Sequence, residues 1–97
     1  MDRANPVIVC SAIKIPTNTQ DILLVGARHW DNLMRNQYTQ TVKIGMDVYR
    51  NQEEQGFIDQ FGKFYNRKDA LILARNNNQI KFELDFNTDK LYSEMLY

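Results

Sequence analysis

The chain has 97 residues, of which 43% are hydrophobic and 25% are charged, so residues 1–97 are predicted to form one globular domain rather than a disordered segment. Twelve basic and twelve acidic residues give a net charge of zero, which argues against proteins that coat DNA or bind membrane surfaces through a basic excess. One cysteine and one histidine, Cys10 and His29, exclude an intrachain disulfide and a Cys/His metal cluster. The longest apolar runs are far below the ~18 residues that span a bilayer, so a cytosolic protein is expected.

The N-terminal part of the chain predicts a β-hairpin. Residues 7–15 are rich in β-branched side chains and end at Pro16, which is typical of a buried strand. A polar turn follows, and residues 21–26 are predicted to be the antiparallel return strand. Because Cys10 lies in the apolar run of the first strand, it is expected to be a buried core thiol.

A helix is predicted after the hairpin. Apolar residues recur with helical spacing from residue 30 or 31 to about residue 38, and Asp31 in the first turn suits the helix dipole. Residues 41–50 are ambiguous: their alternation of period two favours a strand, whereas other positions fit a helical face.

The second half of the chain predicts a strand, a turn and a second helix. Residues 55–59 form the strand, and Gly62 supplies the turn with a positive φ. Asn66 is predicted to be the N-cap of a helix over residues 67–76. The buried stripe of this helix is expected to consist of Ala70, Leu71, Leu73 and Ala74.

The C-terminal segments are less regular. Residues 80–86 alternate apolar and charged side chains, which indicates a half-buried strand or, as the alternative, a long loop. The apolar tail at residues 91–97 is expected to dock on the rest of the protein, because exposing it would be costly. Together these elements predict an α+β fold with a small antiparallel sheet and two main helices.

Two segments carry the residues most typical of an anion site. Arg28 and His29 lie at a strand-to-helix junction, where backbone N–H groups and a guanidinium can bind an anion. Arg67 and Lys68 open the second helix, where basic side chains oppose the helix dipole, which weakly indicates an anionic ligand. As alternatives to an anion site, Arg28 would be a surface charge, His29 would be an ordinary capping residue, and Arg67 with Lys68 would belong to a solvated first turn of the helix.

Enzyme interpretations find little support. The sequence has no nucleophile elbow with Ser, His and Asp in order, no phosphate-binding glycine loop and no pair of carboxylates in a useful context. His29 and Asp31 are two positions apart, and such side chains do not face each other on a helix. The chain is therefore predicted not to be an enzyme, and a nucleotide hydrolase that uses His29 is only a third hypothesis.

The order and spacing of five short motifs resemble a family of small phage proteins, the Thoeris anti-defence sponges. The motifs lie at residues 26–34 (GARHWDNLM), 55–59 (QGFID), 64–70 (FYNRKDA), 78–80 (NQI) and 91–94 (LYSE). The resemblance implies a protein that sequesters cyclic ADP-ribose-type signals of bacterial TIR-domain defence enzymes without degrading them, with no cofactor. It further implies a place in the cytoplasm of the infected bacterial host.

The resemblance also implies an assembly and a set of ligand-binding residues. Such proteins form dimers or higher oligomers up to a hexamer, with the ligand near subunit contacts, and some hold cyclic oligonucleotides at a second site. Arg28 and His29 would bind the ligand or form its pocket. Phe57 would stack on a base, and Asn66 with Arg67 would face ribose or phosphate.

The C-terminal tail would complete the pocket. The resemblance implies that Ser93 and Glu94 help to close it, although this chain has Met95 where the family usually has an acidic residue. An alternative function uses the same tail differently: the chain would be a protein–protein interaction module that inhibits a host enzyme, and residues 91–97 would dock on that partner.

Overall fold

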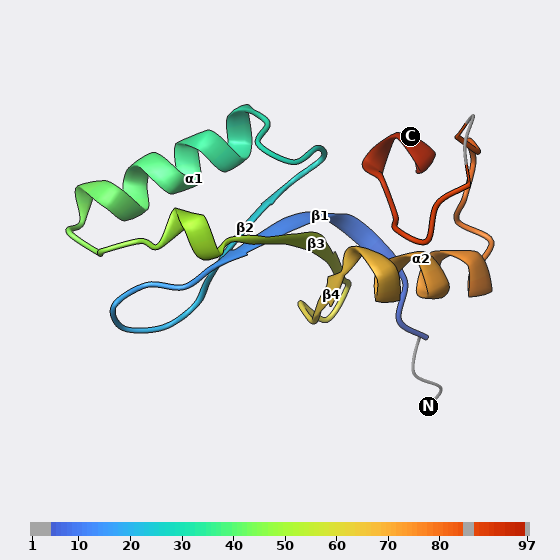
Figure 1. Ribbon diagram of the computed structural model, residues 1–97, viewed down its shortest axis with the longest axis horizontal. Coiled ribbons are helices and arrows are strands. Elements are labelled where there is room, and N and C mark those ends of the chain that lie inside the picture. Colours follow the sequence, from blue (N-terminus) through green and yellow to red (C-terminus); the bar gives the residue numbers. More distant parts are fainter. Residues whose placement is uncertain (1–4, 85–86, 97) are drawn as a thin grey trace.

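A four-stranded antiparallel sheet with the order β2-β1-β3-β4 forms the centre of the computed structural model, which describes residues 5–84 and 87–96 (Figure 1). The elements in chain order are β1 (Ile8–Ile15), β2 (Ile22–Gly26), α1 (Asn32–Lys43), the 3-10 helix η1 (Arg50–Gln52), β3 (Glu54–Asp59), β4 (Phe64–Asn66), α2 (Arg67–Asn76) and the 3-10 helix η2 (Ser93–Met95). The predicted α+β fold with a small antiparallel sheet and two helices is confirmed.

Two hydrophobic clusters lie along one face of the sheet. The first joins β1 and β2 to α1 and contains Ile13, Ile15, Leu24 and Met34. The second joins β1 and β3 to α2 and the tail, and Phe57 is at its centre. Because Phe57 pairs with Ser11, two residues before Ile13 on β1, side chains of both clusters project from the same face.

The ambiguous segment at residues 41–50 is not a strand. Helix α1 continues through Lys43, and the Thr41 hydroxyl donates to the Gln37 carbonyl oxygen one turn earlier at 2.9 Å. The helix ends where Gly45 adopts a φ of 88°, a conformation that glycine tolerates best. Beyond it, Val48 makes an isolated bridge with Thr17. The period-two pattern was misleading because Val42 and Ile44 are exposed rather than buried on one strand face.

Helix α2 forms as its sequence predicts. The Asn66 side chain accepts a hydrogen bond from the Asp69 backbone N–H at 2.8 Å, which caps the helix, and Asn78 beyond the end has a φ of 55°. The residues buried completely or nearly so are Ala70, Leu71 and Ala74, with Leu73 partly buried against the same cluster.

The segment after α2 is a loop over its described residues, not a strand. The backbone N–H groups of Lys81 and Phe82 both donate to the Met95 carbonyl oxygen, at 2.8 and 3.1 Å. Residues 85–86 of the predicted strand lie outside the described residues. The tail docks on the fold as expected, since Leu91 and Met95 are fully buried in the second cluster.

Cys10 is not a core residue. It pairs with Ile58, so it lies on the opposite face of the sheet from Phe57, after a register shift between Ile8 and Cys10. There it is partly exposed and lines an apolar hollow with Val9 and other residues. The apolar run around Cys10 therefore serves both faces of β1 rather than one buried core.

Glutamine side chains satisfy the backbone groups of one residue on β2 and one residue on β1. The Gln37 amide accepts from the Val25 N–H at 2.9 Å and donates to the Val25 carbonyl oxygen at 2.8 Å, on the outer edge of β2. Gln79 makes the same pair of bonds with Ile8, at 2.9 and 2.8 Å, where β1 extends beyond the end of β2. Each amide thus replaces one residue of a neighbouring strand.

Candidate functional site

The loop between β2 and α1 lies beside the C-terminal tail, and the first residue of α2 reaches the same place (Figure 1). Five side chains meet there, which we call the arginine–histidine cluster: Arg28, His29, Arg67, Ser93 and Glu94. The cluster joins segments more than 60 positions apart in the sequence, since Arg28 and Glu94 differ by 66.

Arg28 binds the tail directly. Its Nη1 donates to the Ser93 Oγ at 3.1 Å and to a Glu94 carboxylate oxygen at 3.2 Å. The Ser93 hydroxyl also donates to that carboxylate oxygen at 2.9 Å. The Arg28 side chain is 41% exposed and that of Glu94 63%, and ion pairs so open to water contribute about 0–1 kcal/mol. A stronger anion can therefore displace Glu94 from Arg28 at little cost.

His29 is held as a neutral ring. Its Nε2 lies 2.8 Å from the Gly56 carbonyl oxygen, and its Nδ1 lies 3.4 Å from Arg67 Nη2. A carbonyl oxygen only accepts and a guanidinium only donates, so these partners fit the tautomer with the proton on Nε2. Burial lowers the pKa of His29 below its ordinary value, and the nearby Arg67 charge lowers it further. Both ring nitrogens are thus committed to structural bonds.

The environment of His29 predicts a pH dependence of stability. The unfolded chain binds a proton at His29 more readily than the folded chain, because the folded pKa is the lower one. The contribution of neutral His29 to the free energy of unfolding is therefore fully present above the unfolded pKa of about 6.5, and it is lost as the pH falls from there through the folded pKa. We expect urea denaturation followed by Trp30 fluorescence to show a lower free energy of unfolding at pH 5 than at pH 7.5.

The control for that experiment is His29→Gln, which keeps a donor for Gly56 but cannot titrate. His29 is the single histidine of the chain, so the part of the pH dependence that this variant removes belongs to one group. An identical pH profile in the His29→Gln variant would contradict the assignment.

Arg67 fastens the tail to α2. Its Nη1 donates to the Leu91 carbonyl oxygen at 3.3 Å, and its backbone carbonyl accepts from the Leu91 N–H at 2.9 Å. Its guanidinium also bonds to the Gln55 side chain and lies 4.8 Å from the centre of the Tyr92 ring. Burial lowers the pKa of Arg67, although the residue remains a cation. This second cation is therefore fixed in place.

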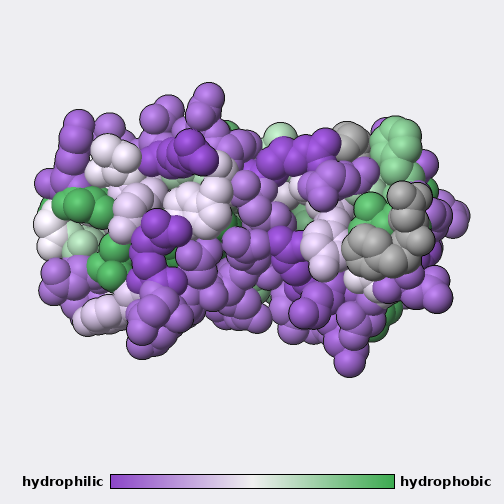
Figure 2. Space-filling model, turned by 45° about the horizontal axis from the view of Figure 1, so that its top comes forward, coloured by the Kyte–Doolittle hydropathy of each residue, from purple (hydrophilic) through white to green (hydrophobic). Residues whose placement is uncertain are grey.

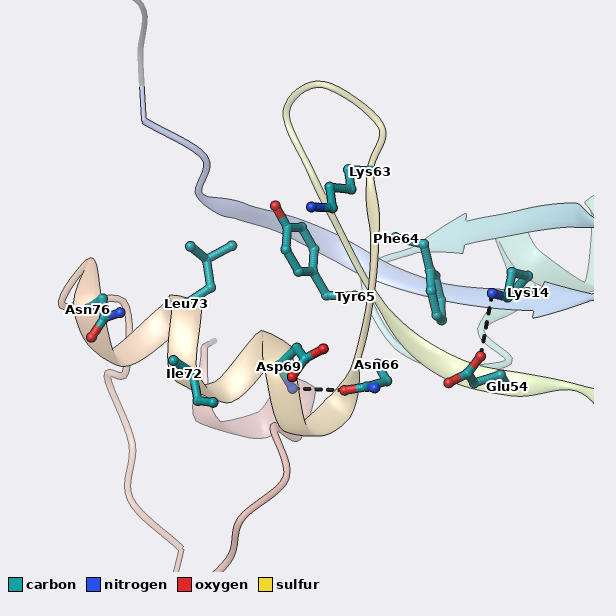
Figure 3. A pocket seen from close by; sticks show the side chains of 10 residues that line it. All are labelled: Lys14, Glu54, Lys63, Phe64, Tyr65, Asn66, Asp69, Ile72, Leu73 and Asn76. Atoms are coloured by element: carbon teal, nitrogen blue, oxygen red, sulfur yellow. Dashed lines mark hydrogen bonds and ion pairs between the residues drawn. The ribbon is translucent and has the colours of Figure 1, made fainter.

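Phe57 and Asn66 lie differently from what the family resemblance implies for them. The Phe57 ring is fully buried and meets the His29 ring edge to face, with 5.2 Å between the centroids. It supports His29 from the core and has no exposed face on which a base could stack. The Asn66 side chain caps α2 and lines a hollow outside the arginine–histidine cluster (Figure 3).

That hollow has a volume of about 500 Å³ and lies between β4 and α2 (Figure 3). Two basic and two acidic side chains line it, so its lining has no excess positive charge. The Lys14 ammonium lies 3.5 Å from the Glu54 carboxylate and 5.0 Å from the centre of the Phe64 ring. The side-chain oxygen of Asn66 already accepts the hydrogen bond that caps α2. The arginine–histidine cluster is therefore the better candidate for an anion.

The sequence did not single out two members of the site. Gln55 holds the Arg67 guanidinium, and Tyr92 supplies the ring beneath it. Both lie inside the quoted motifs, Gln55 in residues 55–59 and Tyr92 in residues 91–94, but neither was given a role there. Their positions in those motifs were a usable signal.

Metal ligands and membrane spans are not found in the described residues. Over 5–84 and 87–96, no three His, Cys, Asp or Glu side chains gather closely enough to hold a metal ion. In the same residues, no helix has the length and apolar character needed to cross a membrane.

Comparison with known protein families gives a match. A family model described as "Phage T4 y16D protein" matches residues 7–97, which extend from the residue before β1 to the end of the tail and include the whole arginine–histidine cluster. No curated protein and no solved structure matches the chain. Because the match covers nearly the full length, the chain belongs to the phage T4 y16D protein family.

Proposed function

We propose that this phage protein is an anti-defence sponge, which binds a cyclic ADP-ribose-type signal in the cytoplasm of the infected bacterial host and sequesters it without cleavage. The observation that carries the proposal is the arginine–histidine cluster, in which the cations of Arg28 and Arg67 converge from two different segments under the tail. The ligand class comes from the resemblance of the five sequence motifs to such sponges.

The geometry supports binding of a diphosphate. One phosphate would replace the Glu94 carboxylate on Arg28, where the present ion pair is weak and exposed. The Arg67 guanidinium stands on the other side of His29 and would face a second phosphate or a ribose. Ser93, which is buried, would remain as a hydroxyl donor beside Arg28, in the tail that closes the site.

The same geometry supports sequestration rather than hydrolysis. A general base needs a free acceptor within reach of the substrate, and the Nδ1 of His29 already accepts from Arg67. The Glu94 carboxylate is exposed and bonded to Arg28 and Ser93. We therefore propose that the protein has no enzymatic activity toward the ligand.

Isothermal titration of the purified protein with cyclic ADP-ribose isomers tests the proposal, with cyclic oligonucleotides as a second set of ligands. We expect saturable binding of at least one cyclic ADP-ribose isomer, and recovery of that ligand with unchanged mass after heat denaturation. No binding at micromolar protein would reject the sponge, and a changed mass would favour a hydrolase. Light scattering in the same samples tests the proposed homo-oligomer.

Arg28→Ala is expected to weaken ligand binding by about 1.5–3 kcal/mol, the range for a hydrogen bond to a charged group. The measurement is the dissociation constant from the same titration. Arg75→Ala is the matched control, since Arg75 is also a surface arginine bonded to a glutamate, Glu83, but lies outside the cluster. Equal dissociation constants for the two variants would remove Arg28 from the site.

The alternative function, inhibition of a host enzyme by protein–protein contact, loses part of its support. The tail that was to dock on the partner packs into this chain's own core through Leu91 and Met95. The face in Figure 2 is mainly hydrophilic, with apolar side chains gathered mostly near its two ends. A host enzyme captured by protein that carries no nucleotide would nevertheless favour this alternative over the sponge.

A further inference from the structure

We propose that the hollow between α1 and η1 is a second binding site, which takes an oxyanion carried on a flat aromatic body. The hollow has a volume of about 400 Å³. It is lined by two arginines, two aromatic residues and a threonine: Trp30, Arg35, Tyr38, Thr39 and Arg50. This proposal does not depend on the function proposed for the arginine–histidine cluster.

The backbone turns Trp30 away from that cluster. Trp30 has a φ of 57°, which is unfavourable for a bulky side chain. His29 contacts β3 and α2, whereas the Trp30 indole contacts α1 and the segment before β3. The Trp30 ring meets the Tyr38 ring edge to face, with 5.7 Å between the centroids, and its Nε1 donates to the Glu53 carboxylate at 3.0 Å. Such strained residues persist where the surrounding contacts hold them in place, and they are frequent at functional sites.

The walls of the hollow are set for an anion. The Arg50 guanidinium lies 4.3 Å from the centre of the Trp30 ring and 5.3 Å from that of Tyr38, which fixes its orientation. Glu53 balances one cation, since it lies 3.4 Å from Arg50. Within the described part of the chain, the Arg35 side chain has no ion pair or hydrogen bond. Two guanidiniums against one carboxylate leave one positive charge for a ligand.

The size of the hollow indicates that the ligand is more than a bare anion. A water molecule takes a share of ~30 Å³ in the liquid, so a hollow of about 400 Å³ has room for a ring as well as an oxyanion. Guanidiniums bind phosphates and carboxylates through paired N–H groups. The Trp30 and Tyr38 rings would pack against the aromatic body, and Arg35 with Arg50 would hold the oxyanion.

The sole tryptophan of the chain reports directly on this site. We expect phenyl phosphate to change the Trp30 fluorescence of the full chain saturably, and to bind about tenfold or more tightly than inorganic phosphate or phenol, each of which offers one half of the ligand. Arg35→Gln should weaken phenyl phosphate binding about tenfold or more, since it removes one charged donor group. Arg50→Gln is the second variant and should act in the same direction.

One control variant locates the signal. Arg75→Gln removes an exposed guanidinium elsewhere and should leave the dissociation constant unchanged. No saturable fluorescence change, or equal binding by the Arg35→Gln and Arg75→Gln variants, would overturn the second site. Cyclic ADP-ribose binding is measured in a separate titration, so failure of the second site and failure of the sponge are distinguishable.

Discussion

Replacing Phe57 with alanine is expected to lower the free energy of unfolding by about 3–5 kcal/mol. The side chain is fully buried where β3, α2 and the tail meet, and it supports the His29 ring. Truncation removes its buried area and leaves a cavity that the surrounding sheet and helix fill only in part. Because domains of this kind are stable by only about 5–15 kcal/mol, part of the Phe57→Ala protein should be unfolded at 37 °C. Urea denaturation followed by circular dichroism measures the effect.

Phe61→Ala is the matched control. Phe61 is the same residue type on the β3–β4 turn, but its side chain is 64% exposed, so the change should stay within about 0.5 kcal/mol. Similar destabilisation by both variants would contradict the core position of Phe57. Phe57→Leu separates packing from recognition: it retains most of the buried volume, so a large loss of ligand binding without a loss of stability would restore the stacking role.

Arg67→Met is expected to weaken ligand binding by about 1.5–3 kcal/mol and also to loosen the tail. Methionine keeps an apolar stem of similar length but removes the donors to Leu91 and His29, and it removes the cation above Tyr92. The Leu91 carbonyl and the His29 ring then lose a partner in a half-buried place. Titration calorimetry measures the binding, and hydrogen exchange of the tail amides measures the loosening.

Lys68→Met provides the comparison for that variant. Lys68 is the next cation along the first turn of α2 and is exposed. Its replacement changes the net charge and the helix dipole interaction equally but leaves the tail contacts intact. Equal hydrogen-exchange rates in the two variants would show that Arg67 does not fasten the tail.

Local signals in the sequence were sufficient for the elements whose stabilising contacts are local. The hairpin and the cap of α2 by Asn66 depend on near neighbours, and both are confirmed. The conformations of residues 41–50 and 80–84 were harder to predict, because tertiary contacts determine them. In the second case, Lys81 and Phe82 find their hydrogen-bond acceptor at Met95, 14 and 13 positions later, instead of on a strand.

The site shows the same division. The sequence indicated Arg28, His29 and Arg67 as separate candidates for an anion site, because each lies near the start of a helix, where an anion is favoured. Their convergence with Ser93 and Glu94 depends on how the tail folds back, which spacing alone does not reveal. The burial of Phe57 follows from the alternation of β3, whose core face only the pairing with β1 defines.

The two glutamine amides on the strand edges also limit how this protein can meet other chains. An exposed edge strand is normally a template for pairing with a further strand. At Val25 and Ile8 the backbone N–H and carbonyl groups are already saturated by Gln37 and Gln79, so an incoming strand would have to displace two good hydrogen bonds at each place. Copies of the chain or host proteins must therefore recognise these two places through side chains and shape, and not through backbone pairing.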